Sequence, residues 1–381
     1  MNANGLERDM AENVLREWMQ FGTPSQSQPV RSEELSDDLF DESLALAIRQ
    51  GALGLAGQAV LLGFPATPAQ RERLDSRLAG AMGWVLRLER SLVAAVREIE
   101  AIGIDHRVQK GLAVAHVVYG AWPAMRVSSD IDLLVRPEDF ERAIEVFEAA
   151  GAKRKVRREL RTGYDLRFSK SADLTDSFGM PLDLHRRISF DFFGHSIDLD
   201  EFFERPVPFY LGGQRLLSPN REALFLNACL RATVGPSYQL STLRDIAELA
   251  FNDQFSADQM RRYTTSWRLE APVDEALRRT EVWIPGVRER LGAAGGLRVR
   301  SRDVNRLSAL SIEGKPMARM MQKAAAQPSW RERAAFLANY LLPDERYRES
   351  SGGWRSYGEL GWSRIVTFAQ RSWRDLRSRR T

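Results

Sequence analysis

The sequence predicts an α+β protein, in which a small mixed sheet has helical regions before and after it in the chain. Apolar residues recur at steps of three and four between Pro68 and about Ala101, which is the spacing of one buried helix face. Between about 101 and 215, short apolar strands alternate with helical segments, as in a mixed α/β unit. Helical patterns return after Pro219. We therefore expect a helical N-terminal region (1–100), an α/β core (101–215) and a helical C-terminal region (216–381).

The N-terminal region is expected to consist of several helices. A short first helix precedes a polar loop at 22–29, and residues 40–60 also have a helical pattern. The long helix that starts at Pro68 has a buried stripe made of Leu78, Met82, Val85, Leu88, Leu92, Val96 and Ile99.

The core is expected to alternate strands and helices. Pro137 opens a helix whose first turn holds Glu138 and Asp139, where the helix dipole favours acids, and Gly151 ends it. The other expected elements are a strand at 106–109, a helix at 112–119, and strands at 130–135, 164–170 and 181–185.

The C-terminal region is expected to hold helices at 222–234, 240–252, 257–263 and 274–282. A last basic, amphipathic helix is expected from Trp362 to Arg379. Its apolar stripe either packs on the protein's own helices, which we favour, or contacts an anionic membrane or an acidic acceptor.

Composition narrows the class of protein. The 55 Lys+Arg and 51 Asp+Glu give a net charge of +4, which is a mixed surface and not that of a dedicated nucleic-acid binder. Cys229 is the only cysteine, so we expect no disulfide within the chain, a buried thiol and a reducing cytoplasm. The most apolar stretch, 51–64, is too short for a transmembrane segment.

Two carboxylates stand at the start of one apolar strand. Because strand side chains alternate between faces, Asp130 and Asp132 should point the same way, opposite the core side chains Ile131, Leu133 and Val135. Two carboxylates this close are poorly tolerated unless a cation neutralises their charge. Mg²⁺ (or Mn²⁺) is suitable because it binds few carboxylates and leaves coordination positions for triphosphate oxygens. Without the metal the two charges repel, so replacing either aspartate by asparagine should maintain or slightly raise stability.

Other residues complete a candidate site for nucleotidyl transfer. Asp183, on a separate strand, is the expected third carboxylate, and His185 shares its face as a hydrogen-bond partner or as a contact to substrate or metal. Candidate phosphate-binding residues are Lys110, Gly111 at a helix start, Arg126, Ser128 and Ser129. Each residue alone can be explained without catalysis: Lys110 as a surface lysine, for example, or Asp183 as the ion-pair partner of Arg186 or Arg187. Together, however, they occur in a functional order.

These motifs resemble bacterial nucleotidyltransferases of the DNA polymerase beta superfamily. The similar segments are Gln109-Lys110-Gly111-Leu112-Ala113, Arg126 with Asp130-Ile131-Asp132-Leu133-Leu134-Val135, Leu182-Asp183-Leu184-His185, Leu217-Ser218-Pro219 and Leu243-Arg244-Asp245-Ile246, within about residues 75–250. The resemblance implies that Asp130 and Asp132 bind metal, that Asp183 completes the site, and that Lys110, Gly111 and Arg126 handle phosphates.

Two departures from the family stand out. The superfamily's Gly-Ser turn is here Lys110-Gly111, and Asn227-Ala228-Cys229 stands where a histidine often occurs. Some family members accompany genes for peptide natural products, so tailoring of such a peptide is one expectation.

The leading hypothesis is transfer of NMP from an NTP to a hydroxyl or phosphate of a peptide, protein or small molecule. One alternative keeps the fold but takes RNA as the acceptor, against which the weak net basicity counts. The other alternative is a non-catalytic nucleotide-sensing scaffold, against which the presence of three carboxylates counts.

Overall fold

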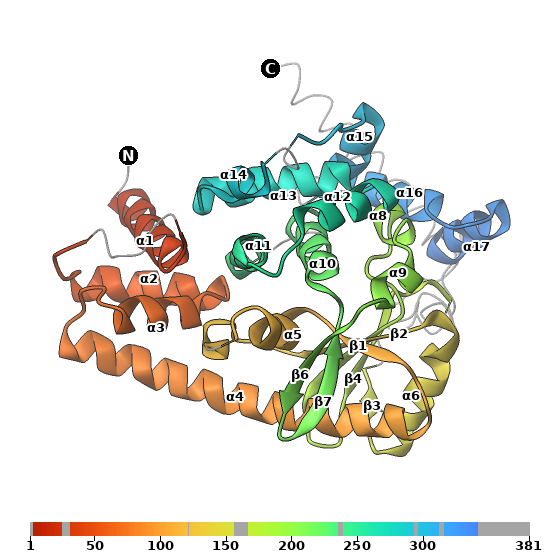
Figure 1. Ribbon diagram of the computed structural model, residues 1–381, viewed down its shortest axis with the longest axis horizontal. Coiled ribbons are helices and arrows are strands. Elements are labelled where there is room, and N and C mark those ends of the chain that lie inside the picture. Colours follow the sequence, from red (N-terminus) through yellow and green to blue (C-terminus); the bar gives the residue numbers. More distant parts are fainter. Residues whose placement is uncertain are drawn as a thin grey trace, which may run out of the picture.

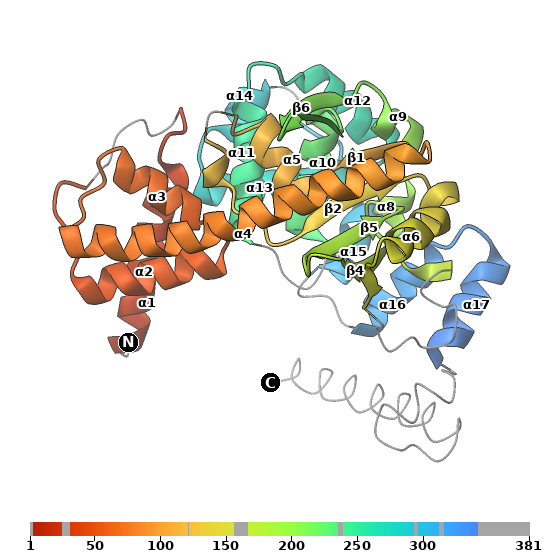
Figure 2. The ribbon, with the colours of Figure 1, turned by 90° about the horizontal axis from the view of Figure 1, so that it is seen from below.

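The computed structural model describes residues 3–24, 31–120, 122–155, 167–234, 239–292, 296–311 and 316–341 (Figure 1). Its N-terminal part is helical, as predicted: α1 (Ala3–Gln20), α2 (Asp37–Arg49), α3 (Leu53–Leu61) and α4 (Pro68–Ala101). Ser36 caps α2, and Thr67 and Gln70 form a reciprocal capping box at the start of α4. The α4 helix runs from the other N-terminal helices along the underside of the molecule to the sheet (Figures 1 and 2).

The centre of the fold is a mixed five-stranded sheet in the order β1-β2-β5-β4-β3. The β2–β5 pair is parallel, and the other pairs are antiparallel. The strands are β1 (His106–Val108), β2 (Ile131–Val135), β3 (Lys153–Arg154), β4 (Ser171–Thr175) and β5 (Pro181–His185). The connections include α5 (Lys110–Val117), the 3₁₀ turns η1 (Pro123–Met125) and η2 (Pro137–Asp139), and α6 (Phe140–Ala149). The small mixed sheet between helical regions confirms the predicted fold class.

The strand predicted at 164–170 is wrong over its described end. Residues 167 and 168 are helical, and β4 begins only at Ser171. Phe168 is buried, which explains the apolar alternation, but it packs in a separate cluster with Met320, Ala324 and Phe336. A contact far away in the sequence therefore placed this side chain. Residues 164–166 lie outside the described part of the chain.

A hairpin that the sequence analysis did not predict follows the sheet. It consists of β6 (Val207–Leu211) and β7 (Gln214–Ser218), joined through Gly212 and Gly213, which have φ values of 52° and 79°. Two glycines with positive φ suit a tight hairpin turn. Two short helices precede it, α8 (Phe192–His195) and α9 (Leu199–Phe203).

The described C-terminal part is helical, as predicted. Its helices are α10 (Arg221–Thr233), α11 (Leu240–Phe251), α12 (Ala257–Ser266), α13 (Glu270–Trp283), α14 (Val287–Leu291), α15 (Ser301–Leu310), α16 (Pro316–Ala325) and α17 (Trp330–Leu341). The predicted tail helix at 362–379 lies outside the described residues.

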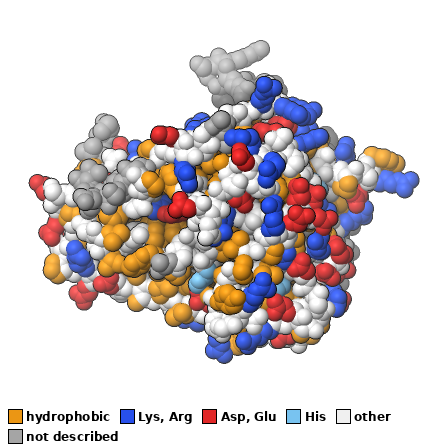
Figure 3. Space-filling view, in the orientation of Figure 1, with side chains coloured by type: hydrophobic (Ala, Val, Ile, Leu, Met, Phe, Trp, Pro, Cys, Tyr) orange, Lys and Arg blue, Asp and Glu red, His pale blue; other side chains and the backbone are white. Residues whose placement is uncertain are grey.

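One cluster of buried apolar side chains extends through all three parts of the chain, from Val14 in α1 through Leu133 in β2 to Leu310 in α15. On the surface, Figure 3 shows apolar side chains gathered over the N-terminal helices and α4, with acidic and basic side chains interspersed elsewhere on that face. None of the described helices combines the length and apolarity needed to cross a membrane. The division into three regions stays a prediction.

Candidate active site

The register of β2 and β5 brings the predicted carboxylates together. Asp132 pairs with Asp183 across the parallel strands, and His185 lies two residues beyond Asp183 on the same face. One ligand atom each from Asp132, Asp183 and His185 lies within 4.8 Å of the others. Asp132 and Asp183, 51 positions apart in the sequence, are thus brought together by strand pairing.

Asp132 is the centre of a buried network of ionisable groups. Its Oδ1 accepts a hydrogen bond from Lys110 Nζ at 2.5 Å and lies 2.9 Å from His185 Nε2, which is also 2.9 Å from Asp183 Oδ2. Burial opposes ionisation of Asp132, but Lys110 and His185 outweigh burial and hold the pKa well below its usual range. Burial likewise opposes ionisation of Asp183, but mainly His185 and then Lys110 lower its pKa to about 2. Both carboxylates are therefore ionised at neutral pH.

Asp130 lies in a different environment, just before β2 begins. Burial, and then the charge of Asp132, raise its pKa, while a 2.9 Å hydrogen bond from Ser129 Oγ opposes the rise. Asp130 lies outside the close cluster of Asp132, Asp183 and His185. The adjacent carboxylates thus differ in how well the protein compensates their charges.

The cluster fits a divalent metal. Among the described residues, the buried Asp183 Oδ1 has no hydrogen-bond partner, which leaves an anionic oxygen able to bind a cation. Carboxylate oxygens from two strands, with an imidazole beside them, suit Mg²⁺ or Mn²⁺. Lys110 Nζ now supplies positive charge at Asp132, so a metal would share or replace that contact.

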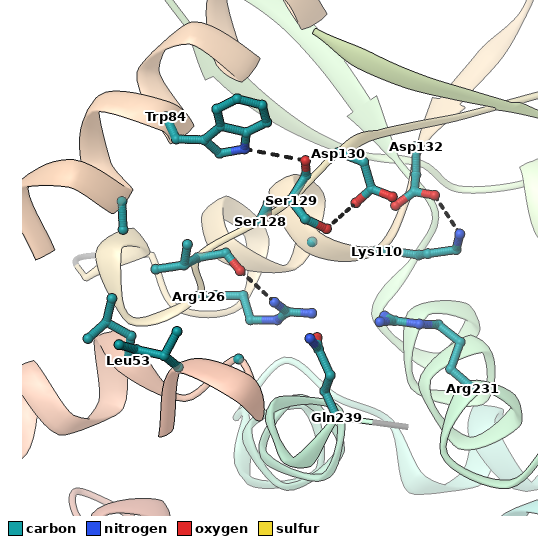
Figure 4. Close-up of a pocket in the computed structure, with 15 residues that line it drawn as sticks. Leu53, Trp84, Lys110, Arg126, Ser128, Ser129, Asp130, Asp132, Arg231 and Gln239 are labelled. Atoms are coloured by element: carbon teal, nitrogen blue, oxygen red, sulfur yellow. Dashed lines mark hydrogen bonds and ion pairs between the residues drawn. The ribbon is translucent and has the colours of Figure 1, made fainter. Parts of the chain in front are cut away.

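A pocket of about 310 Å³ adjoins the carboxylates (Figure 4). Its charged end is formed by Asp130, Asp132, Lys110, Arg126 and Arg231, and Gly111, Ser128, Ser129 and Gln239 also line the pocket. We call Ile48, Leu53, Ala81 and Trp84, from α2, α3 and α4, its apolar end. Figure 4 shows the side chains of Arg126 and Arg231 pointing toward each other inside the pocket.

Two of the predicted phosphate-binding residues also have evident structural contacts. Arg126 Nε donates to both oxygens of the buried Asp245, at 2.9 and 3.0 Å, and so links the loop before β2 to α11. A Cβ at Gly111 would lie 2.4 Å from Ser128 Oγ, so only glycine fits there without movement. These contacts hold the pocket wall in place.

Lys110 begins α5 in a left-handed conformation, with φ of 57°. A lysine in this region of φ is uncommon and costs on the order of 1–3 kcal/mol. Gln109, the residue before it, is held by Asn227 Nδ2 of α10, which donates to Gln109 Oε1 at 3.0 Å. In this chain Asn227 therefore secures the turn that carries Lys110, and Cys229 is buried as predicted.

The sequence analysis missed three charged residues at or beside the site. Arg231 lines the pocket and belongs to α10, a helix whose side chains are mostly buried. A charged residue in so apolar a helix is the only signal in the sequence that could have identified it. Lys170 lies just before β4; burial, then the charge of Lys110, lower its pKa, while Asp183 and Asp132 oppose the change. Asp173 pairs with Asp183 in the β4–β5 register and so shares its face. The strand was predicted at 164–170 and β4 spans 171–175, so Asp173 fell outside the predicted strand and Lys170 fell on its expected apolar face.

Comparison with protein-family models identifies the family of this chain. A family model described as an uncharacterised nucleotidyltransferase matches residues 36–285. The solved structure of an antigenic nucleotidyltransferase-like protein from Paracoccidioides brasiliensis is similar at 13% identity, with a TM-score of 0.33, over 57% of this chain and 95% of that chain. A search of curated proteins gave no match. Because the family model spans more than half of the chain, this protein belongs to that family of uncharacterised nucleotidyltransferases.

Proposed function

We propose that this protein is a metal-dependent enzyme that transfers NMP from an NTP to a hydroxyl or phosphate of a peptide, protein or small molecule. An acceptor oxygen forms a bond to the α-phosphorus, the bond from that phosphorus to the bridging oxygen breaks, and pyrophosphate leaves. The observation that carries the proposal is the cluster of Asp132, Asp183 and His185 within 4.8 Å, next to a pocket lined by cations.

The proposed metal ligands are Asp130, Asp132 and Asp183, with His185 holding the latter two in position. Mg²⁺ or Mn²⁺ bound there would neutralise triphosphate charge and lower the pKa of the acceptor hydroxyl. The unpartnered Oδ1 of Asp183 has one of two roles: it binds the metal that activates that hydroxyl, or it is the base that accepts the hydroxyl proton.

The triphosphate is proposed to bind at the charged end of the pocket. Lys110 and Arg126 supply cationic donors, and Ser128 and Ser129 supply hydroxyl groups. Gly111 lets the start of α5 approach the phosphates. Arg231, whose side chain points into the same space, adds a further cation.

Transfer is tested by incubating the protein with labelled NTPs, Mg²⁺ and a pool of candidate acceptors. We expect release of pyrophosphate and a gain of one NMP mass by one acceptor. Asp130→Asn and Asp132→Asn should abolish transfer, whereas Asp183→Asn should lower kcat far more than NTP affinity. Asp258→Asn, at an exposed site on α12, is the matched control. NTP binding without transfer to any acceptor, or full turnover in Asp183→Asn, would contradict the proposal.

A cytoplasmic location is proposed as well, and it rests on the single, buried cysteine.

A further inference from the structure

The pocket beside the carboxylates has two chemically different ends. Its charged end suits a polyphosphate, whereas the side chains that line its apolar end are uncharged and include one aromatic ring, that of Trp84. Both ends belong to one pocket of about 310 Å³, so a ligand that fills it must be anionic at one end and flat or apolar at the other. A nucleotide has this form, because its ribose joins phosphates to a planar base.

Trp84 is held in a defined orientation at the apolar end. Its Nε1–H donates a hydrogen bond to the backbone oxygen of Ser129 at 3.3 Å (Figure 4). The guanidinium of Arg87 lies 5.5 Å from the centre of the indole ring. Ser129 directly precedes Asp130, so the loop that carries this carboxylate also fixes the indole. A ring that is already ordered loses little conformational entropy when a ligand stacks on it.

Asp183 does not line this pocket, although it is hydrogen-bonded to the same histidine as Asp132. Lys170, just before β4, interacts electrostatically with Asp183, and β4 lies on the side of β5 opposite β2. The nucleotide and the acceptor can therefore reach Asp132 from different sides.

We propose that the apolar end is the nucleobase subsite and that the base stacks on Trp84, an inference that rests on the proposed function. The N-terminal helices α2, α3 and α4 then contribute directly to nucleotide binding, in addition to packing on the core.

The test compares two ligands that share phosphates but differ in the base. Binding of each of the four NTPs and of inorganic tripolyphosphate is measured by titration calorimetry with Mg²⁺, and the tightest NTP is used further. Trp84→Ala should weaken that NTP about 5- to 150-fold, which is the range found for loss of one stacked base. Tripolyphosphate binding should change less than about twofold, because the charged end is intact.

Further variants separate stacking from folding. Trp84→Phe keeps an aromatic face without the N–H group and should bind the NTP within a few-fold of the wild type. Trp84→Leu keeps apolar bulk without the ring and should show the loss even where Trp84→Ala fails to fold. Trp330→Ala, which removes an indole that is 73% exposed on α17, is the matched control and should bind as the wild type does.

Several results would overturn the inference. Equal weakening of NTP and tripolyphosphate would mean that Trp84 only positions the Asp130 loop. Unchanged NTP affinity in Trp84→Ala and Trp84→Leu, or NTPs that bind no better than tripolyphosphate, would place the base elsewhere. Failure of the wild type to bind any NTP would instead refute the proposed function itself.

Discussion

Replacing the two neighbouring carboxylates by amides, one at a time, should affect the metal-free protein in different ways. Asp132 accepts a hydrogen bond from Lys110 at 2.5 Å and lies 2.9 Å from His185, so its charge is compensated. Asparagine at position 132 keeps one neutral acceptor, its amide oxygen, but loses the ion pair with Lys110. Because a hydrogen bond between charged groups contributes about 1.5–3 kcal/mol, Asp132→Asn should lower the free energy of unfolding by about that amount.

Asp130 should behave differently. Burial and the charge of Asp132 disfavour its carboxylate, as its raised pKa indicates, and a hydrogen bond from Ser129 Oγ together with the charge of Lys110 offsets them only in part. Asparagine removes the unfavourable charge and can still accept that bond, so stability should stay the same or rise. We therefore keep the expectation of maintained or raised stability for Asp130→Asn and revise it for Asp132→Asn.

Thermal unfolding in EDTA, followed by circular dichroism, measures both effects. The Tm of Asp132→Asn should fall by about 3–6 °C, at roughly 2 °C per kcal/mol for a chain of this size. Asp130→Asn and the control Asp258→Asn should not fall. The reasoning is refuted if Asp132→Asn unfolds at the wild-type temperature, or if Asp130→Asn loses as much stability.

Three other predictions concern the walls of the site and the sheet. Arg126→Ala leaves Asp245 buried without its cation and should cost about 3–5 kcal/mol in chemical denaturation, and the paired change Arg126→Met with Asp245→Leu should recover much of that loss. Gly111→Ala should cost about 1–3 kcal/mol, because its Cβ would lie 2.4 Å from Ser128 Oγ; adding Ser128→Gly should restore stability, and no effect of Gly111→Ala would contradict the tight packing. Burial lowers the pKa of His106, so the unfolded chain binds its proton more readily than the folded protein. Stability should therefore decline as the pH falls through about 6.5, the pKa of an unfolded histidine, and the free energy of unfolding should depend less on pH in His106→Gln. Identical pH slopes for the two proteins would argue against this role.

Much of the fold could be predicted from the sequence because its signals are local. Helix periodicity marked α4, and its Thr67–Gln70 capping box fixed where that helix starts. The alternating strand around Asp132 was equally clear. The prediction failed at 164–170, where Phe168 is buried by helices more than 140 residues away, and at the β6–β7 hairpin, whose Gly212-Gly213 turn went unnoticed.

For the candidate site, the sequence by itself determined the residue types: carboxylates on two strands, a lysine-glycine turn and a histidine two positions after Asp183. Only the tertiary structure decided how they combine. The β2–β5 register sets Asp132 beside Asp183, Lys110 reaches back to Asp132, and Arg126 is tied to Asp245 of α11. It also added Arg231 and the apolar end with Trp84 to the pocket. The physical reason is that residue spacing along the chain fixes which face of a strand or helix a side chain occupies, whereas its partners come from distant segments that meet only when the core packs.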